Sequence, residues 1–514
     1  MCRREGIIVI RKPINTLLAC FALAGVVLTP LQASAAPNDR IVIAQGVYPV
    51  SFDPHRDVSV PTINVNANIY DALLTRDPDL KIVPSLAESY NRISDTVLEL
   101  KLRKNVVFQN GDPFDAKDVK FSLDRVLNKD EGSPQRGWIN TVSSVDIVDS
   151  HTVRLTTTVP DPVLPARLTL INIVPKNYVE KVGNEGLAAH PVGTGAYKLG
   201  QWVRGDYLDL DVNEKYWGAA PQVKHARFRA IPDVAARIAA LQAKNADIVT
   251  NLPPDYIAPI KRTAGLDVAT VRSARVLFLG LVNTQPGPLQ DQRVRQAINH
   301  AVNVDEIVNS LLLGNGIRAG DVNGHLLRLL GHDFKSKLYD YDPKKAKQLL
   351  AEAGYPNGFS IDMDTPNGRY LMDRDISQII AAQLAEVGIK VNLKVHEWGN
   401  YTQMFTSHKT APIYLLGWSL PSMDPDQWAT PLLGADEPVS NFDDREIQDL
   451  IVAAKQELDS DKRLKLYEKL NNLVHEKAPW LFLHQQVDLY GVNKALDWKP
   501  RSDEGLRLTD IKLR

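Results

Sequence analysis

Three tryptophans in the second half of the chain have the residue type and the surroundings of a ligand pocket. Trp398, Trp418 and Trp480 lie in Glu-Trp-Gly, Gly-Trp-Ser and Ala-Pro-Trp motifs, each beside a segment with a strand pattern. Glycine lets another backbone approach closely, and an indole ring stacks on organic molecules. The motifs therefore suit a pocket for a medium-sized polar ligand. The alternative is that the three rings are core residues.

Motifs that would indicate an enzyme are missing from the sequence. It contains no His-Glu-x-x-His zinc motif, no Gly-x-Ser-x-Gly nucleophile elbow and no Walker loop. Gly314-x-Gly316-x-x-Ala319 matches the dinucleotide pattern, but it follows a helix pattern where a strand is required, and so indicates a turn. The eleven histidines form no pair at metal-ligand spacing. Asp443-Asp444 stands at a helix start, where carboxylates act as caps. We expect no catalytic residue, metal or cofactor.

Composition and charge indicate a globular protein that does not bind nucleic acid. The 514 residues are 44% hydrophobic and 24% charged, and 60 basic residues against 61 acidic ones give a net charge of −1. At roughly 100 to 200 residues per domain, this length predicts about three folded units. Nucleic-acid binders need a basic field, which this chain lacks.

The amino end has the features of an export signal. Two basic residues precede an apolar stretch from Ile14 to Leu31 and the small residues Ala33-Ser34-Ala35. The longest uninterrupted apolar part, Leu17 to Leu28, is shorter than the roughly 18 to 20 residues that span a bilayer. We predict a signal peptide at 1–35, cleaved near Ala35, and a periplasmic protein with a net charge of −4.

Both cysteines of the chain, Cys2 and Cys20, lie in this leader, so the mature protein has no disulfide and no thiolate. Leu17-Leu18-Ala19-Cys20 also resembles a lipoprotein cleavage box, which would leave a lipidated, membrane-tethered protein. The apolar run continues beyond Cys20, which favours cleavage near Ala35.

After the leader, helix and strand patterns alternate in no strict order and predict mixed α/β lobes. Caps and stops indicate helices that start at Asp115, run from Asp342 to Gly354, and form a pair at Asp444–Leu458 and Ser460–Lys477. Strands are expected at 40–44, 96–102 and 276–282. These elements are scaffold for the candidate pocket.

An ordered series of short motifs runs along nearly the whole mature chain. In order, the motifs are Ile69-Tyr70-Asp71-Ala72-Leu73-Leu74, Val83-Pro84-Ser85-Leu86-Ala87-Glu88-Ser89, Leu100-Lys101-Leu102-Arg103, Val107-Phe108-Gln109-Asn110-Gly111-Asp112-Pro113-Phe114, Asp118-Val119-Lys120-Phe121-Ser122, Pro191-Val192-Gly193-Thr194-Gly195-Ala196-Tyr197, Arg295-Gln296-Ala297-Ile298 and Glu352-Ala353-Gly354-Tyr355. With them the chain resembles the extracytoplasmic solute-binding proteins of the peptide/opine/nickel class of ABC importers, which include dipeptide- and oligopeptide-binding proteins.

The resemblance implies an α/β, two-lobed periplasmic binding protein with a small domain inserted in lobe I. Lobe I would comprise 36–69, 191–272 and 484–514, with the inserted subdomain at 70–190 and lobe II at 273–483. Such a protein is not an enzyme. As a monomer without a cofactor, it would capture di- or oligopeptide-like solutes outside the cytoplasmic membrane and deliver them to the importer's permease subunits.

Two alternatives to a peptide carrier stay open at this point. A small sugar, an opine conjugate or a metal chelate could be the solute. A secreted hydrolase of similar size is the rival from another class of protein.

The resemblance also implies where the ligand lies. Trp398 and Trp418, with Ser419 beside the latter, would line the cleft, as would the loop after 51–55, especially Val58 to Val60. His484 would lie where the chain crosses the hinge again.

Two further positions bear on the charge of the ligand. Arg369 lies near the family's carboxylate-reading loop and could hold a carboxylate or phosphate, or it could form an ion pair with Asp373. Relatives that bind peptides carry an Asp three residues after the tryptophan that corresponds to Trp418, and it pairs with the peptide's ammonium. Here that residue is Pro421. The ammonium therefore lacks its usual partner unless Asp424 or Asp426 replaces it, and both could instead be turn residues.

Overall fold

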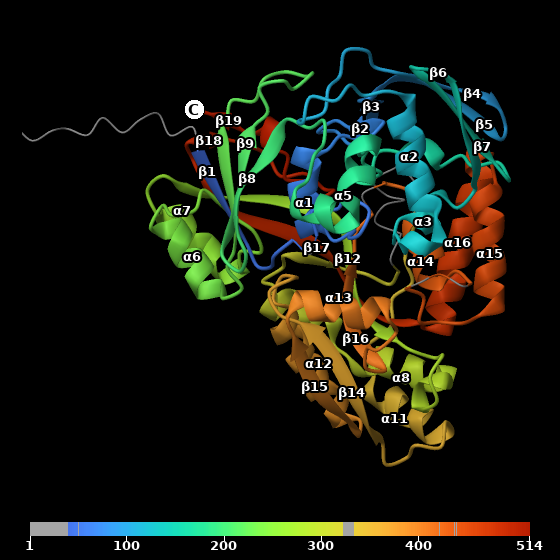
Figure 1. Ribbon diagram of the computed structural model, residues 1–514. Coiled ribbons are helices and arrows are strands. Elements are labelled where there is room, and N and C mark those ends of the chain that lie inside the picture. The colour runs from blue at the N-terminus through green and yellow to red at the C-terminus, as the bar shows by residue number, and fades with distance from the viewer. Residues whose placement is uncertain (1–39, 50, 322–333, 421, 436, 438) are drawn as a thin grey trace, which may run out of the picture. The chain divides into compact units, whose positions relative to one another are not determined.

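A computed structural model describes residues 40–49, 51–321, 334–420, 422–435, 437 and 439–514 (Figure 1). The predicted signal peptide, the possible lipidation site at Cys20 and Pro421 lie outside the described residues. Within the described part of the chain, no helix combines the length and the hydrophobicity of a membrane span.

One large mixed sheet organises the described part of the chain. Its order is β15-β14-β16-β12-β17-β11-β1-β10-β9-β8, and β13 also pairs with β17. The eleven strands are β1 (Arg40–Gln45), β8 (Tyr197–Val203), β9 (Tyr207–Val212), β10 (His225–Ala230), β11 (Ile248–Val249), β12 (Leu266–Leu281), β13 (Gly316–Arg318), β14 (Phe359–Pro366), β15 (Ile389–His396), β16 (Ile413–Trp418) and β17 (Trp480–Asn493).

Two long antiparallel strands, β12 and β17, connect the two halves of this sheet. The segment 266–272 of β12 pairs with 487–493 of β17, next to β11 and β1. The segment 276–281 pairs with β16 and the start of β17. The register shifts between Arg272 and Val276 and again between Leu277 and Phe278. The ladder is therefore interrupted between the two halves of the sheet, close to residue 273.

A separate antiparallel sheet with its own core forms within the first 200 residues. Its order is β4-β5-β7-β6, and buried side chains from 73–173 form one hydrophobic cluster beneath it. Helix α2 packs on it and begins at a capping box, in which Asp115 and Asp118 each accept a backbone N–H. Its strands are β4 (Ala87–Ser94), β5 (Val97–Leu102), β6 (Val142–Asp149) and β7 (Thr152–Thr157). Two pairs of short strands complete the set: β2 (Leu74–Arg76) with β3 (Ile82–Pro84), and β18 (Leu496–Asp497) with β19 (Lys512–Leu513).

The helices follow the caps that the sequence indicates. Asp342 accepts the Lys345 N–H at 2.9 Å and Asp444 accepts two amides, so both are N-caps as predicted. Gly314 has φ 78° after a helical segment, which confirms the turn there. The helices are α1 (Val60–Ile69), α2 (Ala116–Leu127), α3 (Arg136–Ile139), α4 (Leu164–Arg167), α5 (Lys176–Ala189), α6 (Val234–Gln242), α7 (Ile257–Arg262), α8 (Gln292–Ala301), α9 (Val304–Glu306), α11 (Pro343–Glu352), α12 (Asp373–Glu386), α13 (Trp398–Thr406), α14 (Asp426–Leu433), α15 (Arg445–Gln456) and α16 (Ser460–Lys477).

The predicted strands are present, with one difference in length. The strands expected at 40–44 and 96–102 are β1 and β5. The strand expected at 276–282 is the second half of β12, which begins ten residues earlier at Leu266. Between 266 and 272, more buried residues of β12 alternate with more exposed ones, whereas every residue from 273 to 281 is buried. The first half therefore lacks the continuous apolar run by which the second half is predicted.

Candidate functional site

A cavity of about 250 Å³ brings five of the seven predicted ligand-binding residues together. They are Val60, Arg369, Trp398, Trp418 and Ser419. The loop 56–60 before α1, the loop after β14, helix α13 and the end of β16 supply most of the wall. Residues that sequence reasoning did not single out also line it, and they are Asp57, Trp138, Arg275, Tyr370 and Gln427.

Arg369 lies in the loop between β14 and α12, and Asp373 holds that loop in place. The Asp373 carboxylate accepts backbone N–H groups from Gly368, Arg369 and Tyr370 at 2.9–3.1 Å. Burial raises the pKa of Asp373 to about 6, although these hydrogen bonds oppose the shift. The alternative interpretation of Arg369 as a side-chain ion pair with Asp373 is therefore wrong, because Asp373 binds the backbone.

The Arg369 guanidinium is buried among aromatic rings, and no acid of the described chain forms an ion pair with it. The side chain is 6% exposed, and its Cζ lies 4.7 Å from the centroid of Tyr370 and 5.2 Å from that of Trp398. Its Nε has no hydrogen-bond partner, and no ion pair of Arg369 is found among the described residues. Burial and the nearby Arg275 lower the pKa of Arg369. The buried carboxylates of Glu504 and Asp488 oppose this shift, but among the described residues neither is within ion-pair distance, so Arg369 has no bonded counter-charge.

A second guanidinium, that of Arg275 on β12, is fully partnered. Its Nε and Nη2 donate to the two carboxylate oxygens of Glu504 at 2.7 and 2.9 Å, and Nη1 donates to the Gly417 carbonyl. Burial alone would raise the pKa of Glu504, but the adjacent Arg275 lowers it below its usual range. Only one of the two arginines on this side of the cavity therefore has a protein carboxylate beside it.

The two predicted tryptophans serve the cavity in different ways. Trp398 begins α13 and is 5% exposed, stacks with Tyr401, and leaves its buried Nε1 without a partner. Trp418 ends β16, is half-buried, and donates from Nε1 to the Gln427 carbonyl at 2.8 Å. The Ser419 hydroxyl is also buried and unpartnered. With Arg369, the wall therefore presents three polar groups whose hydrogen bonds are not satisfied by the protein.

The other predicted residues are placed elsewhere. Asp424 forms a bidentate ion pair with Arg463 at 2.7 and 2.8 Å, and Asp426 contacts Arg167, which keeps the pKa of Asp426 low despite burial. Neither lines the cavity, so neither stands where an ammonium partner is needed. His484 is fully buried under Gly316 and outside the wall, and Trp480 is a core residue against Phe278.

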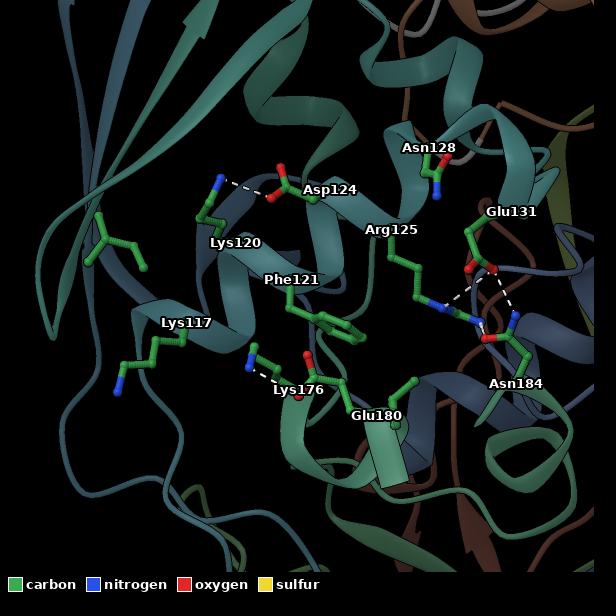
Figure 2. Close-up of a pocket in the computed structure, with 12 residues that line it drawn as sticks. Lys117, Lys120, Phe121, Asp124, Arg125, Asn128, Glu131, Lys176, Glu180 and Asn184 are labelled. Atoms are coloured by element: carbon green, nitrogen blue, oxygen red, sulfur yellow. Dashed lines mark hydrogen bonds and ion pairs between the residues drawn. The ribbon is translucent and has the colours of Figure 1, made fainter. Parts of the chain in front are cut away.

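Larger hollows exist, but they do not gather such groups. A hollow of about 510 Å³ between α2 and α5 is lined by charged side chains that bind one another (Figure 2). Among the described residues, no group of three or more His, Cys, Asp or Glu side chains is placed to hold a metal ion.

Comparison with known proteins places the chain in a family. The family model for bacterial extracellular solute-binding proteins, family 5, matches residues 81–438. The chain belongs to this family. The solute-binding protein is 29% identical to the dipeptide-binding protein of Escherichia coli K12, over 90% of this chain and 92% of that one.

Two solved structures share its fold. The periplasmic binding protein DppA of Helicobacter pylori, in complex with the peptide STSA, matches with a TM-score of 0.86 and 27% identity over 92% of this chain and 98% of that one. AgaA of A. tumefaciens R10, in complex with agropinic acid, matches with a TM-score of 0.85 and 25% identity over 92% and 99%. These likenesses confirm the predicted family and the two-lobed, mixed α/β fold of an ABC importer's binding protein. The family is one of binding proteins, not of enzymes.

Proposed function

We propose that this solute-binding protein captures a small, peptide-like solute with an anionic group outside the cytoplasmic membrane and delivers it to the permease of an ABC importer. The observation that carries this proposal is Arg369, a buried guanidinium at the cavity wall that forms no ion pair with any acid of the described chain. A carboxylate or phosphate could accept two parallel hydrogen bonds from it and neutralise its charge.

The size and the wall of the cavity favour a small ligand. At about 250 Å³, the cavity lies just below the roughly 300–1,000 Å³ of sites for drug-sized molecules. Aromatic rings from Trp138, Tyr370, Trp398 and Trp418 supply most of its large side chains. A dipeptide or a conjugate of similar size suits this space better than a long peptide does.

Delivery would depend on movement of two lobes about the ligand. The lobe boundaries near 272 and 484, and the inserted subdomain at 70–190, are part of this proposal. Its support is the interrupted ladder between Arg272 and Val276 and the separate hydrophobic cluster within 73–173. Ligand contacts on both sides would stabilise the closed form, and the permease would select that form. Export by a signal peptide cleaved near Ala35 belongs to the same proposal.

Native mass spectrometry of protein purified without extensive washing tests the solute class. We expect a co-purified molecule of about dipeptide size that bears a carboxylate or phosphate. An opine conjugate would fit this expectation, whereas a neutral sugar or a cationic metal chelate would contradict it. Incubation of the recovered solute with fresh protein should return it intact, since turnover would indicate a hydrolase.

A further inference from the structure

The charged residues that line the cavity divide into partnered and unpartnered ones. Arg56 donates to the Glu131 carboxylate at 2.7 Å, and Arg275 is held by Glu504. Arg369 has no such partner among the described residues. The fourth charged residue is Asp57, and it is the one acid among the described residues that line this cavity. After internal pairs are removed, the wall carries one positive and one negative charge.

Asp57 keeps part of its hydrogen-bonding capacity free. It lies in the loop before α1, where its two oxygens accept the Ser59 N–H at 3.0 Å and the Ser59 hydroxyl at 2.6 Å. No cation of the described chain lies within ion-pair distance of it. An ionised carboxylate offers about four lone-pair sites, so two remain for a ligand.

Asp57 also lines a second, smaller chamber, of about 80 Å³. Asn66 and Gln135 are 2% and 3% exposed on its wall, and the Oδ1 of one and the Oε1 of the other have no partner. Their amide nitrogens donate to the carbonyls of Ser51 at 3.4 Å and Pro54 at 3.1 Å. If either side-chain amide were flipped, its oxygen would face a backbone carbonyl oxygen, so these hydrogen bonds fix the orientation of both amides. The Asn66 Oδ1 and the Gln135 Oε1 are then left as acceptors without a donor.

The remaining charges of the chamber wall are engaged within the protein. Arg76 donates to the Leu80 and Ser422 carbonyls, and Arg507 donates to Thr75. Asp71 accepts from Thr194 and Trp217, and Asp503 binds Arg501. The Arg76 Nε is a buried donor without a partner, and once the Asp503–Arg501 ion pair is set aside, two carboxylates, Asp57 and Asp71, stand against two guanidinia on this wall. The wall charges therefore balance, and it is the free acceptors of Asp57, Asn66 and Gln135 that favour a cation.

From this arrangement we infer that the solute is a zwitterion whose primary ammonium enters the chamber at Asp57, while its anionic group binds Arg369. The inference rests on the proposed function and deepens it. A primary ammonium has three N–H donors, and the chamber offers three acceptor groups, in Asp57, Asn66 and Gln135. Asp57 thereby replaces the acid that peptide-binding relatives carry where this chain has Pro421, a role for which Asp424 and Asp426 are not available.

Isothermal titration calorimetry of the full protein with three probes tests the inference. The probes are alanyl-leucine, its N-acetylated form and its C-terminal amide. We expect acetylation to weaken binding at least tenfold, because an acetamide cannot carry the charge that Asp57 requires. Asp57→Asn should weaken the free dipeptide by a similar factor and leave the acetylated form unaffected. Asn keeps an acceptor for the Ser59 N–H, so the turn is preserved.

The matched control is Asp233→Asn, which removes one carboxylate charge at the start of another helix. Asp233 accepts the Ala236 N–H at the start of α6 and lines neither cavity, so Asp233→Asn should bind all probes as the wild type does. Gln135→Met, which removes one acceptor at similar shape, should weaken only the free ammonium forms, by less than Asp57→Asn does.

The outcomes separate this inference from the proposed function. Equal affinity for the free and acetylated dipeptides would overturn the ammonium subsite and leave the peptide-like solute standing. No binding of any probe would instead overturn the peptide-like assignment. In that case native mass spectrometry of the co-purified solute decides the inference, because a solute without a cationic group overturns it and one with an amine supports it.

Discussion

The cavity beside Arg369 and the hollow between α2 and α5 differ in a way that volume does not reveal. The hollow is about twice as large, yet its Arg125 is bound by Asp53, by His55 at 2.8 Å and by Asn184 at 2.8 Å, and Figure 2 shows the contact with Asn184. In the cavity, Arg369 is equally buried and has no such partner. Buried polar groups that the protein does not satisfy therefore indicate a ligand site better than empty space does.

The largest expected effect is on stability, in the hollow. Arg125→Met removes the two direct hydrogen bonds of the fully buried Asp53 to a guanidinium and leaves Arg56, at 3.7 Å, as its one ion-pair partner among the described residues, which costs roughly 3 kcal/mol of unfolding free energy. Urea denaturation followed by circular dichroism measures this. Ligand affinity should not change, and a variant as stable as the parent would contradict the distinction between the two regions.

The corresponding substitution in the cavity should lower ligand affinity and leave stability nearly unchanged. Arg369→Met removes a buried charge that has no ion-pair partner among the described residues, although Glu504 and Asp488 interact with it over a longer distance, so the melting temperature should stay within a few degrees of the parent. Affinity for an anionic solute should fall about 30-fold or more, equivalent to roughly 2 kcal/mol or above. Calorimetry and thermal unfolding give both values. Arg374→Met, at an exposed arginine at the start of α12, is the control and should change neither. A large loss of stability in Arg369→Met would show a structural role.

His484 sharpens the comparison, because it is unpartnered but lines no cavity. Burial lowers its pKa to about 4, against about 6.5 in an unfolded chain. The unfolded state therefore takes up the proton first, and stability should fall as the pH falls from about 6.5 to 4, by about 2 kcal/mol from this group. Urea titrations at pH 7 and 4.5 should show that His484→Phe lacks this part of the loss. Exposed His225→Phe should keep it.

The smallest effect on ligand affinity is expected at the half-buried aromatic wall. Trp418→Ala should weaken binding by the stacking energy of roughly 0.5–1.5 kcal/mol in addition to lost contact area, with little change in stability. Trp398→Ala should also lose affinity, but its burial in the core makes a stability cost of about 3–5 kcal/mol the expected result. Equal melting temperatures of the two variants would contradict this difference, which the sequence did not predict.

Local signals account for what could be predicted from the sequence. The caps at Asp115, Asp342 and Asp444 act on amides two to three residues away, so a short window contains both partners. The positions of Arg369 and Trp418 near the cavity followed from motifs of the family. The strand β1 followed from its apolar run.

Pairings across long stretches of chain could not be predicted in the same way. Arg275 and Glu504 are 229 residues apart, and no local pattern links them. The same holds for Asp424, which was a candidate anchor until Arg463 proved to be its partner. Asp57 lies in the loop that the sequence placed at the cleft, but whether it can bind a ligand cation depends on which neighbouring charges are paired within the protein. That depends on the folded chain.

Glu504 does not belong to the cavity wall, yet it decides how much positive charge that wall carries. A neutral residue at position 504 would release Arg275 and turn a site for one negative charge into a site for two. The shape of the cavity and the side chains that touch the solute would be unchanged. In a lineage of such carriers, a new class of cargo could thus arise from one substitution in the carboxyl-terminal segment, before any wall residue changes.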